Sequence, residues 1–485
     1  MVERFAKAIK MDIEKFRQNA HELVDWMADY LRDLEEYPVR AQVSPGEILK
    51  QLPSNPPSRS DSFEEIFDDF QKIVLPGMTH WQHPSFFAYF PANSSPPSVL
   101  AEMVTATIGA QCMSWETSPA AAELEQRMME WLREIIGLPS EFQGVIQDSA
   151  SSATLCAILS ARERATDWRV NRAGLSGEPD MVVYGSTECH SSVEKNVKIA
   201  GLGKKNFRKI QVTDTFAIDT RALVDAIERD KAEGRLPICM VAALGSTSSS
   251  AIDPLLDIAD ICKRHRLWLH VDAAWAGSAL VDPELRWMID GIEGVDSFVF
   301  NPHKWLFTNF DCSAYFVRSP DALLKTLSIL PEYLKSEGGE AVRNYRDWGV
   351  PLGRRFRALK LWFVLRSYGI EQLRKMIRTH IDYAQELALE IGAERDFELL
   401  APTPLALVCF RYRPTKVASP VELDSVNERI VKEINDSGAA YLTHTRLNGA
   451  YAIRISIGQA GTKQHHVKNL WSRVKQTARG IRLVV

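Results

Sequence analysis

The segments 267-LWLHVDAA-274 and 298-FVFNPHKW-305 share one pattern, a short apolar run that ends in an ionisable residue. The first run ends at Asp272 and the second at Lys304, 32 positions further along the chain. That separation is about one strand–helix–strand unit, so the two side chains are expected to meet at one edge of a sheet. A carboxylate at the end of a buried strand is costly unless it is paired.

Similar apolar runs recur through the middle of the chain and alternate with helical stretches. Helices are expected at Leu223–Glu233 and Leu255–His265. Strands are expected at Met181–Gly185, Ile238–Gly245, Leu267–Ala273, Val295–Asn301 and Cys312–Val317. The alternation predicts a mostly parallel sheet covered by helices on both faces, with ligands beyond the carboxyl ends of its strands.

The flanking segments predict two further parts. Apolar residues recur at three- and four-residue steps from Asp12 to about Tyr37, which indicates an amphipathic helix. Pro38 and 53-PSNPP-57 then indicate an extended arm, which could cover either a neighbouring subunit or the chain's own large domain. A helix after Gly369 and two strand-like runs predict a smaller α+β domain; the runs are Leu405–Tyr412 and Tyr451–Ile457. The expected divisions are 1–85, 86–360 and 361–485.

Composition excludes several classes of protein. The 485 residues carry a formal charge of −4, which offers no basic field for nucleic acid. The start of the chain lacks the basic and apolar segments of a signal peptide, and the apolar run Ile238–Leu244 is far shorter than the roughly 18 residues of a membrane span. The seven cysteines are scattered singly, without a metal-ligand spacing. We therefore expect a cytoplasmic protein without a bound metal.

Lys304 and Asp272 together have the chemistry of a pyridoxal 5'-phosphate (PLP) site. Such a site needs a lysine that forms an imine and an acid that keeps a ring nitrogen protonated. Taken singly, an acid after a strand is more often a helix cap or an ion-pair partner, and a lone lysine is usually a solvated charge. Their joint placement favours the functional interpretation.

Two further segments could belong to the same site. Residues 147-QDSASSAT-154 open a long helical run with small hydroxyl side chains, so Ser149, Ala150 and Ser151 could bind a phosphate at the helix start. The alternative is an ordinary serine N-cap. His190 follows the strand expected at Met181–Gly185, at the level where a cofactor would lie, although a lone histidine is usually structural.

The chain is similar to a known family over essentially its whole length. Five motifs carry this resemblance: 86-FFAYFP-91, 270-HVDAA-274, 301-NPHKW-305, 310-FDCS-313 and 351-PLGRRF-356. On these motifs the chain resembles the group II PLP-dependent amino-acid decarboxylases, and within them the aromatic-L-amino-acid (DOPA, tyrosine or tryptophan) decarboxylases. The resemblance implies the aspartate-aminotransferase-like fold, PLP fold type I, with a seven-stranded sheet. It also implies a homodimer whose active sites lie at the interface, where the N-terminal segment packs.

The resemblance implies a role for each matching residue. Lys304 would carry PLP, Asp272 would pair with its ring nitrogen, and His190 and Ala274 would lie on the two faces of the ring. The remaining cofactor contacts would be Ser149, Ala150, Ser151, Asn301 and His303 at the phosphate, Thr247 beside the ring, and Leu352 and Gly353 from the partner subunit. The aromatic substrate pocket would be lined by Trp81, Tyr89 and Phe90.

One pocket segment departs from the family pattern. Relatives often carry an aliphatic residue and a phenylalanine before a Ser-Trp pair, where this chain has Gln111 and Met113. These two residues make the expected substrate-binding wall more polar and less aromatic. The sequence therefore does not say which aromatic amino acid is preferred.

The reaction expected from the resemblance is decarboxylation, with Tyr333 as the donor of the proton to Cα. Related enzymes that release an aldehyde, with consumption of oxygen, usually carry Phe at the Tyr333 position or Asn at the His190 position, and neither change is present. Aldehyde synthesis is therefore the alternative function. A PLP-binding regulatory module is less favoured because residues 1–60 are too short and too acidic for a DNA-binding domain with its linker.

Overall fold

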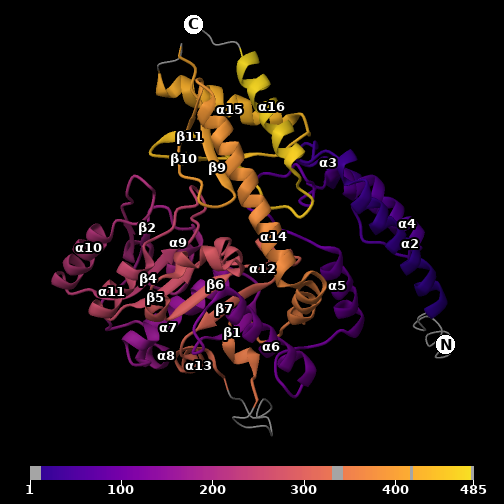
Figure 1. Cartoon of the computed structure of the whole chain (residues 1–485). Helices are drawn as coiled ribbons and strands as arrows, with labels where there is room; N and C mark the ends of the chain where they lie inside the picture. The colour runs from indigo at the N-terminus through magenta and orange to yellow at the C-terminus, as the bar shows by residue number, and fades with distance from the viewer. Residues whose placement is uncertain (1–11, 330–341, 416–418, 482–485) are drawn as a thin grey trace, which may run out of the picture.

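Residues 12–329, 342–415 and 419–481 are described by the computed structural model. Its large sheet has the strand order β1-β7-β6-β5-β4-β2-β3 (Figure 1). The strands are β1 (Gln143–Gln147), β2 (Met181–Ser186), β3 (Phe207–Ile210), β4 (Leu236–Ala243), β5 (Trp268–Asp272), β6 (Ser297–Phe300) and β7 (Ser313–Val317). Among neighbouring strands only β7 runs antiparallel to its partners, β1 and β6. The predicted mostly parallel, seven-stranded sheet is therefore confirmed.

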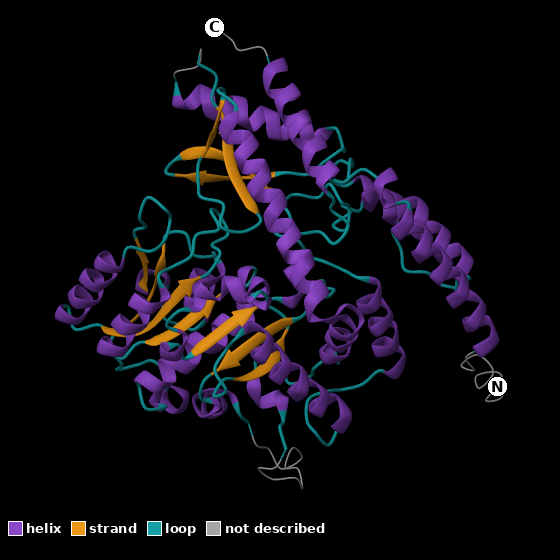
Figure 2. Cartoon of the chain, viewed as in Figure 1, coloured by secondary structure: helices purple, strands orange, loops and turns teal. Residues whose placement is uncertain are grey.

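Helices cover both faces of this sheet (Figure 2). They include α5 (Pro96–Ile108), α6 (Pro119–Ile136), α7 (Ala150–Ala165), α8 (Arg169–Ala173), α9 (Ser192–Ile199), α10 (Thr220–Ala232), α11 (Leu255–His265), α12 (Pro302–Trp305) and α13 (Pro320–Leu327). Because both faces are covered, every residue of β2, β6 and β7 is buried. The strands consequently read as continuous apolar runs, which is why the sequence revealed them.

A second, antiparallel sheet has the order β10-β11-β9-β8. Its strands are β8 (Phe397–Leu399), β9 (Leu407–Tyr412), β10 (Thr443–Leu447) and β11 (Ala450–Ser456), and α15 (Pro420–Asp436) and α16 (Gln464–Gly480) pack nearby. The long element α14 (Arg357–Ala393) contacts α5 and α6 as well as β8 and β9. It changes direction at Gly369, whose φ of 68° and ψ of 163° are open to glycine almost alone. One hydrophobic core continues from the large sheet into this smaller unit.

The N-terminal helix α2 (Ile13–Arg32) has no buried residue, and four large apolar side chains are exposed on it: Ile13, Phe16, Val24 and Leu31. In Figure 1, α2 lies along α4 (Phe63–Asp69) and extends away from the large sheet, with α3 (Glu47–Gln51) nearby. Trp26 packs edge-on against Phe67 and Phe70, so this arm has a small core of its own. Ile13, Phe16, Val24 and Leu31 are left exposed by the described part of the chain.

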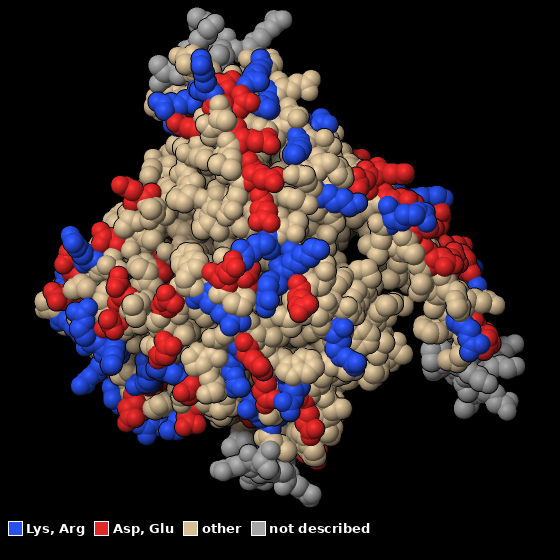
Figure 3. Space-filling view, viewed as in Figure 1, with Lys and Arg blue, Asp and Glu red and all other residues tan. Residues whose placement is uncertain are grey.

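Charges of both signs are interspersed on the face shown in Figure 3. No helix in the described ranges combines the length and the apolar character that crossing a membrane requires.

Candidate active site

The predicted site residues come together because each follows the carboxyl end of a strand. Ser149 follows β1, His190 follows β2, Thr247 follows β4, and Lys304 follows β6, while Asp272 is the last residue of β5. Since β1, β2, β4, β5 and β6 all run in the same direction, these five residues share one edge of the sheet.

Lys304 lies in α12, a single helical turn that begins with Asn301 as its N-cap and Pro302 as its first residue. Its Nζ atom lies 5.4 Å from the centre of the Phe90 ring. Within the described residues this amine has no hydrogen bond and no ion pair. Burial lowers the pKa of Lys304, and the nearby Asp272 carboxylate opposes that shift. The site therefore offers an amine that deprotonates, and so becomes nucleophilic, more readily than a surface lysine.

Asp272 is held by its own turn, because its Oδ1 accepts a hydrogen bond of 3.0 Å from the Ala274 N–H. The Ala274 carbonyl in turn accepts from the Asn301 N–H at 2.9 Å, which ties the end of β5 to the start of α12. Oδ2 of Asp272 has no hydrogen-bond donor among the described residues. It is available to a protonated ring nitrogen.

His190 is exposed at the mouth of the site, and its Nδ1 lies 2.8 Å from the Ser192 hydroxyl. Desolvation by the surrounding protein lowers the pKa of His190; Asp272 opposes this shift and Lys304 adds to it. Asp272 and Lys304 are thus close enough to His190 for their charges to influence its ionisation. The lowered pKa favours the neutral imidazole, and the side chain is exposed, as stacking on an aromatic cofactor requires.

The start of α7 has the properties of an anion site. Ser149 is the N-cap, and its hydroxyl accepts from the Ser152 N–H at 3.2 Å. The backbone N–H groups of Ala150 and Ser151 have no acceptor in the described part of the chain, and both point out of the first turn of a 16-residue helix. Asn196 of α9 donates to the Ser151 carbonyl at 2.7 Å, which joins this helix start to the helix that follows His190.

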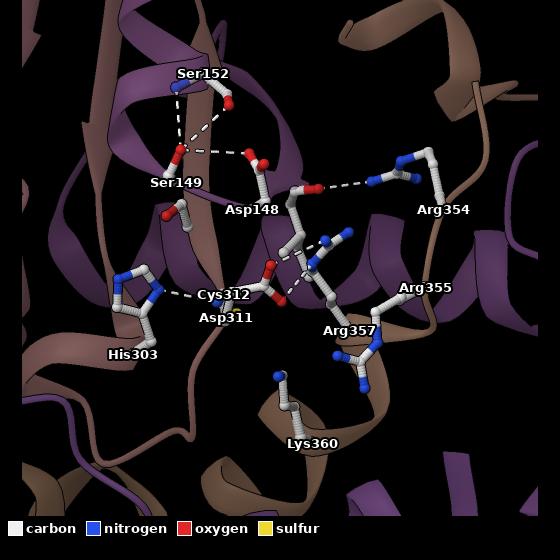
Figure 4. A network of polar contacts seen from close by, with 12 residues as sticks. Asp148, Ser149, Ser152, His303, Asp311, Cys312, Arg354, Arg355, Arg357 and Lys360 are labelled. Atoms are coloured by element: carbon white, nitrogen blue, oxygen red, sulfur yellow. Dashed lines mark hydrogen bonds and ion pairs between the residues drawn. The ribbon is translucent and has the colours of Figure 1, made fainter. Parts of the chain in front are cut away.

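The two interpretations of residues 149–151, a serine N-cap and an anion site, are therefore compatible. The Ser149 cap uses only the Ser152 N–H and leaves the N–H groups of Ala150 and Ser151 without an acceptor among the described residues. Arg354, Arg355, Arg357 and Lys360 are drawn with this helix start in Figure 4, which also shows Asp311 as the partner of Arg357. All four are paired with acids. Arg354 pairs with Glu125, Arg357 with Asp311, and Arg355 and Lys360 with Glu102. The free charge at the anion site is accordingly that of the helix N-terminus.

Asn301 and His303 are fixed by hydrogen bonds to the start of β7. The Ser313 hydroxyl donates to Asn301 Oδ1 at 2.7 Å. The Cys312 N–H donates to His303 Nδ1 at 2.9 Å, as Figure 4 shows. Burial lowers the pKa of His303 to about 3, so its ring is neutral and carries its proton on Nε2. That N–H is free to donate to a ligand.

Aromatic side chains form the wall beside Lys304. Phe90 stacks on Trp275 at 4.3 Å between ring centres, and Trp275 stacks on Trp305 at 4.6 Å. Trp81 stacks on Tyr89 at 5.7 Å, and both are partly open to solvent. Trp81 and Tyr89 therefore lie together, and Phe90 lies next to the Lys304 amine.

Arg454 was missed by reasoning from the sequence. It lies in β11, is only 4% exposed, and has no carboxylate partner among the described residues. It donates to the Thr247 carbonyl at 2.7 Å and to the Thr443 hydroxyl at 2.9 Å, and its guanidinium carbon lies 5.4 Å from the Phe90 ring centre. The sequence feature that could have revealed Arg454 is 453-IRI-455, where a cation stands between two apolar residues. An unpaired charge inside an apolar run is costly, which suggests a function.

Four predicted residues form a separate group. Gln111 Oε1 accepts from the Arg354 N–H at 2.8 Å, the Arg354 carbonyl accepts from the Cys112 N–H at 3.0 Å, and Gly353 lies beside the Gln111 amide. Met113 follows in the same segment, and Leu352 is exposed. None of the contacts of these residues is with Lys304, Asp272 or His190 of the same chain. The remaining prediction, Tyr333, lies outside the described residues.

The only group of three possible metal ligands in the described ranges is Glu35, His465 and His466, remote from this site. His466 Nδ1 accepts from the Lys463 N–H at 2.9 Å, which leaves its proton on Nε2, facing Glu35 at 3.3 Å. That proton occupies the position that a metal would need, so the contact is a hydrogen bond.

Four features lie at one edge of a mostly parallel sheet: a nucleophilic lysine, an acid with a free oxygen, an exposed imidazole and an anion-binding helix start. Together they define a PLP-dependent enzyme of fold type I. The comparisons with known proteins agree. Residues 45–413 match the pyridoxal-dependent decarboxylase conserved domain. The chain belongs to this family, its cofactor is PLP, and it is a decarboxylase.

Three similar proteins illustrate the range of the family. Tyrosine decarboxylase 1 of Narcissus pseudonarcissus is 40% identical, over 96% of this chain and 93% of the relative. Phenylacetaldehyde synthase of Arabidopsis thaliana is 41% identical, over 96% of each chain. The crystal structure of Oryza sativa TDC with PLP and tryptamine superposes with a TM-score of 0.94 at 34% identity, over 97% of this chain and 98% of that one.

Proposed function

We propose that this chain decarboxylates an aromatic L-amino acid (tryptophan, tyrosine, phenylalanine or DOPA) to the corresponding amine and CO2. The observation that carries the proposal is the Lys304 amine, which has no hydrogen bond among the described residues, lies 5.4 Å from the centre of the Phe90 ring and is close enough to Asp272 to feel its charge. A flat aromatic side chain fits such a wall through ring stacking.

When bound, PLP supplies an electron sink for the electron pair that remains as CO2 leaves. The protein supplies the rest. Lys304 would hold the cofactor, Asp272 would keep a proton on its ring nitrogen, and His190 and Ala274 would hold the ring between them. The phosphate would accept hydrogen bonds at the α7 start from Ser149, Ala150 and Ser151 and from the side chains of Asn301 and His303, with Thr247 beside the ring.

The choice among the bonds at Cα is a matter of orientation, since the bond that breaks must stand perpendicular to the cofactor ring. Trp81, Tyr89 and Phe90 would set this orientation by holding the substrate ring. Arg454 provides a positive charge next to Phe90 that no described acid neutralises, and we assign to it the attraction of the substrate carboxylate. Tyr333 remains the predicted donor of the proton to Cα.

The alternative function is aromatic aldehyde synthesis, which a relative of similar identity is named for. The presence of His190 and Tyr333 favours the amine as product. The purified protein should be incubated in air with each of the four amino acids while CO2, amine, aldehyde and peroxide are measured together. We expect amine equal to CO2. Aldehyde and peroxide in place of amine would establish the alternative, and absence of CO2 from all four substrates would overturn the proposal.

We further propose that the enzyme is a cytoplasmic homodimer in which residues 1–85 pack at the interface between large domains spanning 86–360, with 361–485 as the small domain. The exposed apolar residues of α2 support this arrangement, as do the separate positions of Gln111, Met113, Leu352 and Gly353, which would complete the partner's site. Mixing Lys304→Ala subunits with Gly353→Trp subunits should restore activity, because each heterodimer keeps one intact site. An active monomer at assay concentration would overturn the proposal.

A further inference from the structure

The orientation of the Gln111 side-chain amide is fixed by the backbone. Its only hydrogen bond within the described residues joins the side chain to the Arg354 N–H at 2.8 Å. Because that backbone group is a donor, the atom facing it must be the oxygen, Oε1, and the NH2 group must point the other way. The assignment of oxygen and nitrogen in this amide is therefore unambiguous.

Arg354 makes this anchor rigid. Its guanidinium is buried and forms a two-fold contact with Glu125, at 2.6 and 3.1 Å, and it also donates to the Ile146 carbonyl at 2.6 Å. Glu125 accepts from the Ile146 N–H at 2.8 Å, so both partners are attached to β1, the strand that leads to Ser149. The Gln111 amide is thus held in place by the frame of the large sheet.

The NH2 group has no acceptor among the described residues. It lies along Gly353, where a Cβ atom would stand 3.2 Å from Nε2, and both residues are exposed in the single chain. Glycine at this position leaves open the space in front of the amide. An oriented and unused hydrogen-bond donor therefore faces the region where, under the proposed function, the partner's substrate ring lies.

We infer that Gln111 selects a substrate with a hydroxyl group on its aromatic ring, tyrosine or DOPA, by donating a hydrogen bond from Nε2 to that oxygen. The inference rests on the proposed function and on the proposed interface. A substrate without an acceptor would cover the NH2 group and leave it unsatisfied, which is costly in a closed site. Phenylalanine has no acceptor on its ring, and the indole N–H of tryptophan is a donor only.

The test compares tyrosine with phenylalanine. In the intact enzyme we expect kcat/KM for tyrosine to exceed that for phenylalanine by about tenfold to a hundredfold, the scale of one unsatisfied polar group. Gln111→Met has nearly the same length and no polar atoms, and it should bring this ratio close to one by lowering the tyrosine value.

Two further measurements make the result specific. Competitive inhibition by 3-(4-hydroxyphenyl)propionate and 3-phenylpropionate, which have no amino group to react, should show the same ratio and the same loss in Gln111→Met. The matched control is Gln126→Met in α6, a half-buried glutamine whose amide donates to Glu130, and it should change neither ratio. A tyrosine-to-phenylalanine ratio that is the same in the intact enzyme and in Gln111→Met would overturn the inference. Failure to release CO2 from any aromatic amino acid would overturn the proposed function instead.

Discussion

Under the proposed function, Asp272 has two tasks: Oδ1 accepts from the Ala274 N–H, and Oδ2, which has no donor among the described residues, would pair with the cofactor. Asp272→Asn can keep the first task through its amide oxygen, so the turn should survive. The negative charge that holds a proton on the ring nitrogen would be lost. We expect turnover to fall by at least about a hundredfold, or about 2.7 kcal/mol of barrier, with Tm nearly unchanged. Near-normal turnover in steady-state assays would remove Asp272 from the catalytic residues.

Arg454 should act on the substrate and leave the product unaffected, because only the amino acid carries a carboxylate. Arg454→Lys keeps the positive charge, whereas Arg454→Met removes it. We expect Arg454→Met to lower kcat/KM by at least about tenfold and Arg454→Lys to retain more activity, while the affinity for the amine product stays within about twofold in both. Equal losses of affinity for amine and amino acid would indicate that Arg454 only positions the Thr247 loop.

The first turn of α7 allows its anion site to be tested without unfolding the helix. Ala150 is the first helical residue, where proline is tolerated, and Ser149 before it already has the extended backbone that a following proline favours. Ala150→Pro removes one free N–H. We expect the Kd for PLP, followed by fluorescence titration, to rise by about tenfold, with the Tm of the apoenzyme preserved.

Ser149→Ala should change both properties, because Ser149 is the N-cap and also a proposed phosphate donor: the apoenzyme should lose about 1 kcal/mol of stability and the Kd for PLP should rise. Ala150→Pro, which leaves the cap in place, therefore tests the cofactor site apart from the helix cap. An unchanged affinity for PLP in Ala150→Pro would show that the N–H of residue 150 does not bind the phosphate.

At the scale of the whole molecule, buried neutral histidines set the response to acid. Burial lowers the pKa of His270 and of His380 to about 4 each. An unfolded histidine has a pKa of about 6.5, so below that pH the unfolded chain binds more protons than the folded one. Stability is therefore fully present above pH 6.5 and falls as the pH drops towards 4, by about 2 kcal/mol per histidine at pH 5.

Thermal unfolding at several pH values between 7 and 5 should show this decrease. His270→Asn, which can still contact Thr154 and Ser297, should have a lower Tm at pH 7 but a weaker dependence on pH. An unchanged pH dependence in this variant would mean that His270 does not contribute to acid unfolding.

The sequence by itself determined the strands that are buried on both faces. Strands β2, β4, β5, β6 and β7 are covered on both faces, so each is an apolar run that local pattern detects. Lys304 and Asp272 were found because an ionisable residue at the end of such a run is conspicuous. β1, β3, β8 and β10 were missed since they are short or carry polar residues on one side, for example 207-FRKI-210.

Only the tertiary structure decided which residues share an environment. Ser149 could be a cap or a phosphate ligand from its sequence, and the folded helix start shows two N–H groups left over. Arg454 is 150 residues from Lys304 in the chain, and it reaches Phe90 because β11 is attached to that segment by the hydrogen bond of 3.0 Å from the Ser456 N–H to the Phe87 carbonyl. The Gln111 amide is oriented by Arg354, 243 positions away. Sequence patterns report local periodicity, whereas a charge without a partner or an oriented donor depends on contacts between distant segments, which folding alone creates.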